Sequence, residues 1–261
     1  MRYIQCLGGD MMREKIIREL HQIEMTENVR IIMAIESGSR AWGFESVDSD
    51  YDVRFIYVRN EEDYLRLEGV RDVIEWQLDE VLDINGWDLQ KALRLLYKSN
   101  ATVSEWCASP IVYMAREEFL ELKDILPQYF SPKKAMFHYL SSASGNYRQW
   151  LKDDEVKLKK YFYVLRPILA AKWIAKRKTA PPMLFEELMY AELEEELIPT
   201  VEKLLVMKKS MGEMGTAPKI QVLNDYIEKM IPLLREQAEK MADERANWQS
   251  LNELFLRMVR K

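Results

Sequence analysis

The feature that most constrains this chain is a glycine-serine turn between two apolar runs. The first run, Ile31–Ile35, ends just before Gly38 and Ser39, and the second begins directly after Asp50 and Asp52. Short apolar runs bounded by turn residues are typical of buried strands. The spacing therefore predicts a strand, a tight turn and a second strand that opens with two acids.

The two acids are placed to share one ligand. Alternate side chains of a strand point to the same side, so Asp50 and Asp52 are expected to face one site. Two carboxylates held this close repel each other unless a hard cation lies between them, and Mg²⁺ completed by substrate phosphates is the expected occupant. Gly38 and Ser39 supply backbone N–H groups that can approach phosphate oxygens without a Cβ in the way.

This arrangement resembles the signature of nucleotidyltransferases of the DNA polymerase β type. That signature is Gly-Gly or Gly-Ser, a spacer of about ten residues, and Asp-hydrophobic-Asp-hydrophobic. The Gly38-Ser39 turn, a spacer over 40–49 and the segment 50–53 fit it without a gap. The wider segments GSRAWGF, DSDYDVRF, GWDLQKAL, SEW and SPIVY are similar to the branch with members associated with RNA ligases and RNA repair. The resemblance is strong over the first half of the chain and weaker over the second.

The resemblance implies transfer of a nucleoside monophosphate from a nucleoside triphosphate (NTP) to a hydroxyl, with an RNA end as the suggested acceptor. Two Mg²⁺ ions would clamp the attacking and leaving oxygens, and Asp50 and Asp52 would bridge both ions. A third carboxylate is expected between hydrophobic residues just before the next helix, where Asp83 matches. Asp88 fits the same local pattern but is better explained as a helix-start residue that the helix dipole favours.

Further residues are expected to hold the triphosphate. Ser39 would donate a hydrogen bond to the β- or γ-phosphate. Arg40 and Arg54 fit either a phosphate contact or an ion pair with a nearby acid. The nearby acids are Glu36, Glu45 and Asp48.

Basic residues in the second half are also nucleotide-binding candidates. Lys159, Tyr163 and Arg166 lie at i, i+4 and i+7, so they share one helix face. Related enzymes often hold the triphosphate with a basic residue from a helix after the core, which makes Lys159 and Arg166 the candidates and the adjacent Lys160 less well aligned. A solvated charged face is the alternative, because the surrounding segment is generally basic.

Composition bounds the class of protein. The 261 residues, 48% of them hydrophobic and 31% charged, describe a globular chain able to bury a sizeable core. A net charge of −5 provides no global basic field, so any contact with RNA must come from a local patch. The two cysteines, Cys6 and Cys107, fit neither a zinc site nor a disulfide framework and are expected to be reduced thiols of a cytoplasmic protein. No apolar run approaches the length of a membrane span.

The periodicity predicts an α/β (α+β) fold: a nucleotidyltransferase catalytic domain at 12–115 with a mixed sheet, and an all-helical domain at 116–261. The expected N-terminal elements are helices over 12–26, 61–67 and 87–98 and strands over 29–37, 53–58, 72–78 and 81–84, with a break at Asn85-Gly86. The expected later helices cover 116–125, 133–153, 154–177, 184–207 and 220–261, with no convincing strand.

Two other functions are consistent with the same residues. The acceptor could be a small molecule or a protein side chain, or the chain could be a non-catalytic NTP-binding, antitoxin-like regulatory module. Intact Gly38, Ser39, Asp50 and Asp52 argue against the second, since a module freed from catalysis has no need of converging carboxylates.

Overall fold

The computed structural model describes residues 2–77, 81–211, 215–243 and 246–261, with side chains for residues 11–76, 81–210, 215–243 and 246–261. The strands of the main sheet are β1 (Arg30–Glu36), β2 (Tyr51–Val58), β3 (Val73–Gln77), β4 (Leu82–Asp88) and β5 (Val112–Ala115). The helices around it are α1 (Arg2–Glu27), α2 (Gly38–Trp42), α3 (Glu61–Tyr64), α4 (Leu89–Tyr97), α5 (Ala101–Ala108) and α6 (Glu117–Tyr129). The remaining elements are α7 (Pro132–Trp150), β6 (Glu155–Lys157), α8 (Lys159–Arg177), α9 (Phe185–Glu192), the 3₁₀ helix Glu195–Leu197, α10 (Ile198–Met211), β7 (Thr216–Pro218), α11 (Gln221–Glu239) and α12 (Gln249–Val259).

The described strands β1–β5 form a mixed sheet in the order β3-β4-β2-β1-β5. Strands β2 and β4 are parallel, and every other neighbouring pair in this sheet is antiparallel. In the parallel pair, Asp52 lies opposite Asp83. The mixed sheet and its covering helices confirm the predicted α/β fold class.

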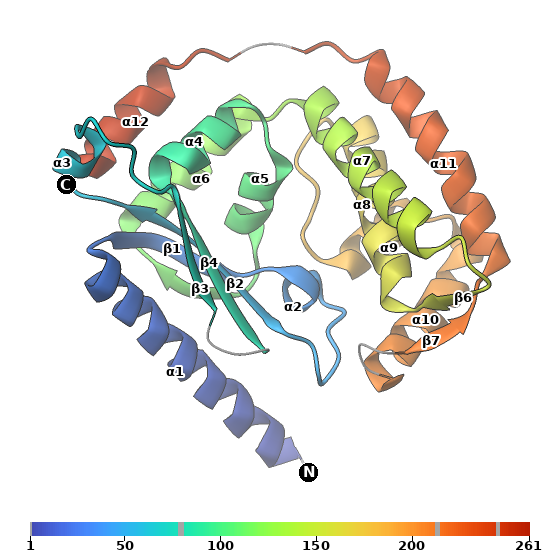
Figure 1. Cartoon of the computed structure of the whole chain (residues 1–261). Coiled ribbons are helices and arrows are strands. Elements are labelled where there is room, and N and C mark those ends of the chain that lie inside the picture. The colour runs from blue at the N-terminus through green and yellow to red at the C-terminus, as the bar shows by residue number, and fades with distance from the viewer. Residues whose placement is uncertain (1, 78–80, 212–214, 244–245) are drawn as a thin grey trace.

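Helices cover both faces of the sheet (Figure 1). On one face, Ile16, Leu20 and Ile23 of α1 are fully buried in a cluster with Phe55 and Tyr57 of β2. The other face packs against α4, α5, α6 and α12 in a second cluster. Successive strand residues point to opposite faces, so the alternation along β2 assigns each side chain to a layer.

The position of the acids follows from that alternation. Asp52 and Arg54 are on the same face of β2 as Ile56, which belongs to the buried cluster that includes α4 and α12. They lie at the beginning of β2, where the side chain of Asp52 remains 32% exposed. The start of this strand therefore offers a polar, accessible patch on an otherwise buried sheet.

Helices dominate the C-terminal part, as the sequence predicts. Helices α7, α8, α9 and α11 pack together around a core that includes Phe162, Leu165 and Ile227. Besides the helices, β6 and β7 form an antiparallel ladder of three residues each, which the periodicity did not indicate. Of the described helices, none is both long and apolar enough to cross a membrane.

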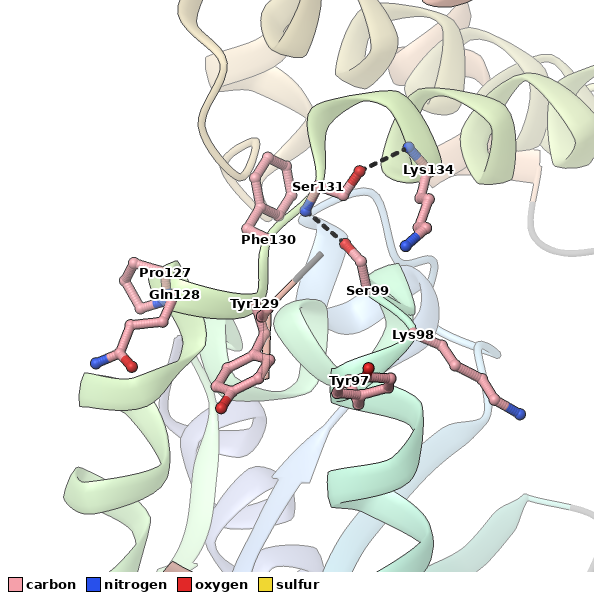
Figure 2. A pocket seen from close by; sticks show the side chains of 10 residues that line it. Tyr97, Lys98, Ser99, Pro127, Gln128, Tyr129, Phe130, Ser131 and Lys134 are labelled. Carbon is pink, nitrogen blue, oxygen red and sulfur yellow. Dashed lines mark hydrogen bonds between the residues drawn. The ribbon is translucent and has the colours of Figure 1, made fainter. Parts of the chain in front are cut away.

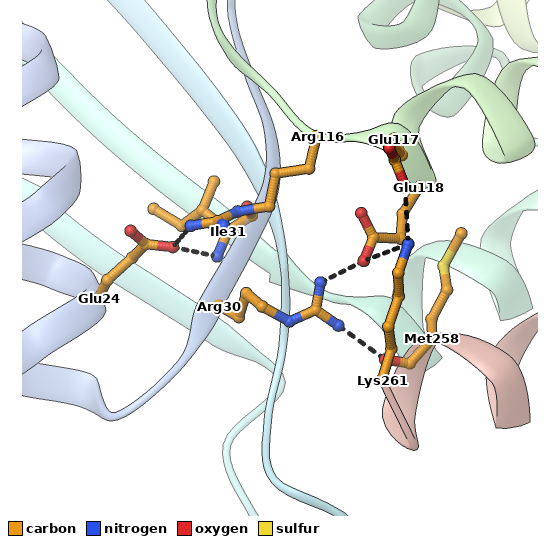
Figure 3. A network of polar contacts seen from close by, with 8 residues as sticks. All are labelled: Glu24, Arg30, Ile31, Arg116, Glu117, Glu118, Met258 and Lys261. Carbon is orange, nitrogen blue, oxygen red and sulfur yellow. Dashed lines mark hydrogen bonds and ion pairs between the residues drawn. The ribbon is translucent and has the colours of Figure 1, made fainter.

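Helix α12 returns to the sheet, at the opposite end of the molecule from α11 (Figure 1). Arg30 of β1 donates to the carbonyl of Met258 at 2.7 Å and pairs with Glu118 of α6. Lys261 lies 3.5 Å from Glu118, so this network fastens the C-terminal helix to the sheet (Figure 3). The division at 115/116 stays a prediction, but α6 and α12 share the buried cluster of the sheet, not that of the helical part.

Several local expectations are wrong. The helix expected over 184–207 is divided into α9, the 3₁₀ helix and α10, and the helix expected over 220–261 is divided into α11 and α12. Asn85 and Gly86 do not separate a strand from the next helix but lie inside β4. A Cβ on residue 86 would lie 2.1 Å from Cε2 of Phe55, so this glycine permits close packing and does not make a turn. The short strand β5, which pairs with β1 at the sheet edge, was also missed because its four residues carry little periodic signal.

Candidate active site at the start of β2

Two carboxylates from neighbouring strands form the centre of the site. Asp52 and Asp83 are partners in the parallel register, and their side chains are 32% and 48% exposed. The guanidinium of Arg54 bridges them, with Nη2 3.0 Å from Oδ1 of Asp52 and 2.8 Å from Oδ2 of Asp83. Arg54 therefore forms an ion pair, as one alternative held, but with acids other than those named for it.

The Gly38 turn lies against this pair. Gly38 has φ +60° and begins α2, and Ser37 before it donates its N–H to the carbonyl of Asp52 at 2.8 Å. A Cβ on residue 38 would lie 2.1 Å from Oδ2 of Asp52. Ser39 follows in the same turn and is buried. Glycine is required here by both backbone conformation and space.

Asp50 lies one residue before β2 and is exposed. Arg40 shapes this loop: it donates to the carbonyls of Ser49 at 2.6 Å and Asp50 at 3.0 Å, and its guanidinium lies 3.7 Å from the centre of the Tyr51 ring. Arg40 thus holds the backbone that presents Asp50. Its predicted contact with phosphate stays a prediction.

Lys208 of α10 supports the same loop from the helical part, a role that sequence analysis missed. It is only 1% exposed, and its Nζ lies 2.9 Å from Oγ of Ser46 and 3.2 Å from Oγ of Ser49. A buried lysine requires polar partners. The sequence signal was available only as one basic residue among several on α10, with nothing to mark its burial.

Glu36 at the end of β1 was named only as a possible ion-pair partner of Arg40 and Arg54, and it has a different role in the structure. Its Oε1 accepts the backbone N–H of Asp52 at 2.7 Å, and its other oxygen accepts the hydroxyl of Tyr113. Burial raises the pKa of Glu36 to about 7, although both hydrogen bonds act to lower it. The residue ties β1, β2 and β5 together behind Asp52.

Asp88 has a structural role at the start of α4. It is the N-cap, and Oδ1 accepts the N–H of Gln90 at 2.7 Å while Oδ2 accepts the hydroxyl of Tyr64 at 2.9 Å. Burial raises its pKa, partly offset by these hydrogen bonds. The helix-start interpretation of Asp88 is confirmed, and Asp83 is the acid that lies beside Asp52.

The two basic candidates of α8, Lys159 and Arg166, have different surroundings in the structure. Lys159 begins the helix and is half-buried. Arg166 is buried, donates to Oε1 of Glu105 at 2.7 Å and lies 4.6 Å from the ring centre of Trp42. These contacts hold the guanidinium of Arg166 against Glu105 and Trp42, and its role in binding the triphosphate stays a prediction. Helix α8 is buried on most sides, so its charge spacing does not reveal which positions reach solvent.

The donors of the site suit a hard divalent cation. Asp52 and Asp83 offer carboxylate oxygens, and the absence of a Cβ at Gly38 lets the carboxylate of Asp52 lie against the turn. Among the side chains that the structure describes, no three His, Cys, Asp or Glu groups lie close enough to hold a metal together. The pair fits an ion whose remaining ligands are water and substrate phosphates, which is usual for Mg²⁺. That Asp50 joins them stays a prediction.

A cavity of about 540 Å³ lies elsewhere, where α4 and α5 meet α6 and α7 (Figure 2). Ser131 donates its N–H to Oγ of Ser99 at 2.7 Å along its wall. The lining residues are Tyr97, Lys98, Ser99, Pro127, Gln128, Tyr129, Phe130, Ser131, Lys134 and Ala246. None of them is acidic, so this cavity lacks the ligands for the metal chemistry expected at β2.

The chain is similar to proteins of a known family. A family model described as "RNA repair pathway DNA polymerase beta family" (RlaP) matches residues 12–257. The chain belongs to this family. The match spans both the sheet and the helical part, so it includes the β2 site and the helices that support it. Membership supports a nucleotidyltransferase of the polymerase β type.

One curated protein and one solved structure are also similar to this chain. The uncharacterized protein YcgL of Bacillus subtilis (strain 168) is 45% identical over 251 residues, which are 95% of this chain and 96% of the relative. A nucleotidyltransferase-like protein from Exiguobacterium sibiricum 255-15 is 13% identical, with 86% of this chain and 74% of that chain covered and a TM-score of 0.31. The family assignment rests on the family model.

Proposed function

We propose that this protein is a Mg²⁺-dependent nucleotidyltransferase that moves a nucleoside monophosphate from an NTP to a hydroxyl acceptor and releases pyrophosphate. The observation that carries the proposal is the register of β2 and β4, which sets Asp52 beside Asp83 directly under the Gly38 turn. A phosphate-binding turn next to paired carboxylates from adjacent strands is what metal-assisted transfer at a triphosphate requires.

The residues of the chain divide the work as follows. Asp52 and Asp83 would hold Mg²⁺, which when bound neutralises charge on the triphosphate and orients it. The Gly38 turn would offer backbone N–H groups, and Ser39 its hydroxyl, to phosphate oxygens. Asp83, the more exposed acid of the pair, would accept the proton of the acceptor hydroxyl at Oδ1, the oxygen opposite the one that Arg54 contacts. Asp50 and Lys159 are proposed as further ligands of metal and triphosphate.

We propose an RNA end as the acceptor. The description of the family supports this choice, and the net charge of −5 requires that the contact be local. A small molecule or a protein side chain would use the same site residues, because the acceptor does not change how the triphosphate is held.

The test is to incubate the protein with each α-labelled NTP, Mg²⁺ and cellular RNA, and then to separate the RNA, protein and small-molecule fractions. Label is expected in RNA for the native protein and to be lost in Asp52→Asn. Binding of Mn²⁺ and nucleotide, measured by thermal melts, provides a readout that does not need the acceptor. Transfer that persists in both Asp52→Asn and Asp83→Asn contradicts the site, and binding without transfer to any fraction favours a regulatory module.

A further inference from the structure

Arg54 fills the space between the two carboxylates. Besides its contacts with Asp52 and Asp83, its Nη1 donates to the carbonyl of Asp83 at 3.1 Å. Its side chain is only 19% exposed, so the guanidinium is held in a defined place. Asp52 and Arg54 are two residues apart on β2 and therefore stand on the same face, which puts the cation beside the acid by local geometry alone.

The charges of this cluster oppose a second cation. Two carboxylates and one guanidinium sum to −1, and Arg54 already occupies one oxygen of each acid. A divalent ion on the same acids would lie next to a positive guanidinium in a half-buried site, where like charges are poorly screened. The pair should hold a metal less tightly with Arg54 in place than without it.

A triphosphate reverses this balance. It adds several negative charges, and its oxygens match the planar fork of an arginine better than they match a point charge. The Gly38 turn, where the triphosphate is expected, lies against Asp52 and so within the neighbourhood of Arg54. The transfer of the guanidinium from acid to phosphate would require a change of the Arg54 side-chain rotamer.

We propose that Arg54 is an exchangeable counter-cation: it pairs with Asp52 and Asp83 in the free protein and transfers to the triphosphate when a divalent cation takes the acids. This inference rests on the proposed function. Its consequence is that metal and nucleotide bind cooperatively, and the coupling must be the same whichever ligand binds first.

The first measurement is the affinity for Mn²⁺ alone, by electron paramagnetic resonance of the free ion. Arg54→Met and Arg54→Gln are expected to bind Mn²⁺ at least tenfold more tightly than the native protein. Arg59→Met is the matched control, because Arg59 follows the far end of β2 and contacts the Arg71 carbonyl and the Tyr57 ring, not the acids. It should bind Mn²⁺ as the native protein does.

The second measurement is the coupling, by thermal melts with Mn²⁺, with each of the four non-hydrolysable NTP analogues, and with both. In the native protein the shift with both ligands should exceed the sum of the separate shifts, and in Arg54→Met this excess should disappear. Without metal, Arg54→Met should melt earlier than the native protein, because the two like-charged carboxylates then lose the guanidinium that lies between them. The Gln variant retains amide donors and serves if the Met variant does not fold.

The outcomes separate this inference from the proposed function. If Arg54→Met and Arg54→Gln bind Mn²⁺ no more tightly than the native protein while Asp52→Asn abolishes binding, the exchange is wrong and the metal site stands. If Asp52→Asn and Asp83→Asn leave Mn²⁺ binding unchanged with and without the NTP analogue, the proposed metal site is wrong. The proposed exchange of Arg54 is then wrong as well.

Discussion

Gly38 lies so close to Asp52 that a Cβ on residue 38 would come within 2.1 Å of the carboxylate oxygen Oδ2. The two residues belong to different elements, the start of α2 and the start of β2, yet they form one surface. The backbone at Gly38 has φ +60°, which L side chains rarely adopt. The turn and the acid are therefore matched to each other in shape as well as in chemistry.

Replacing Gly38 by alanine should displace Asp52 and weaken metal and nucleotide binding together. The left-handed backbone alone is expected to cost about 1–2 kcal/mol of folding free energy, and the clash with Oδ2 adds to it. Gly145→Ala is the control, because nothing lies within 4 Å of a Cβ there. In helix α7 that change should stabilise by up to about 1 kcal/mol without altering binding. Equal binding in both variants would contradict the predicted role of the turn.

Asp83→Ala and Asp88→Ala should fail in different ways. Asp83→Ala is expected to reduce nucleotidyl transfer by orders of magnitude while leaving the fold stable, because half of its side chain is in solvent. Asp88→Ala removes the cap of α4 and leaves the Tyr64 hydroxyl without its acceptor, which should cost about 1–3 kcal/mol with transfer intact. Urea unfolding and transfer rates, measured on both variants, distinguish a loss of stability from a loss of transfer. Loss of transfer in folded Asp88→Ala would move the third carboxylate to that residue.

Lys208 and Lys209 allow a matched test of how the acid-bearing loop, residues 43–50 between α2 and β2, is supported. Lys208→Met removes the donor to Ser46 and Ser49 and should weaken nucleotide binding about tenfold, or about 1.4 kcal/mol. Lys208→Arg should restore part of it, since a cation again reaches the hydroxyl groups. Lys209 is exposed, and Lys209→Met should bind like the native protein. If Lys208→Met only lowers the melting temperature and leaves nucleotide affinity unchanged, the lysine supports the fold and not the site.

Acid should release helix α12 through Glu118. Burial acts to raise the pKa of Glu118, but hydrogen bonds from its own N–H and from Arg30, with the charge of Lys261, hold it below the ordinary value of 4.5. A carboxyl whose pKa is lowered by folding stabilises the protein above its unfolded pKa, and this is lost as pH falls through the folded value. Glu118→Gln should therefore cost about 1–3 kcal/mol at pH 7, and the difference from the native protein should shrink below pH 4.5. Urea unfolding at a series of pH values tests this, and a constant difference would contradict it.

The fold was predictable where local pattern and tertiary packing agree. The apolar runs at β1 and β2 and the turn at Gly38 were located from sequence to within two residues. The break predicted at Asn85-Gly86 was wrong, because the sequence does not distinguish a glycine that allows close packing, here against Phe55, from one that allows a turn. The burial of Arg166 could not be predicted, because charge spacing along α8 carries no information about which side of that helix is buried.

Local sequence was sufficient to locate the turn, the acids Asp50 and Asp52 at the start of β2 and the family that they indicate, because these features depend on residues close together in the chain. Tertiary structure alone decided which distant acid lies beside Asp52. Local context favours Asp83 but also allows Asp88, because both acids are flanked by hydrophobic residues. In the structure, the parallel register of β2 and β4 pairs Asp83 with Asp52, and Asp88 is the N-cap of α4. It also decided that Lys208 is buried against the acid-bearing loop and that Arg54 bridges both carboxylates. Such pairings depend on how strands and helices pack, and residues far apart along the chain give no local sign of them.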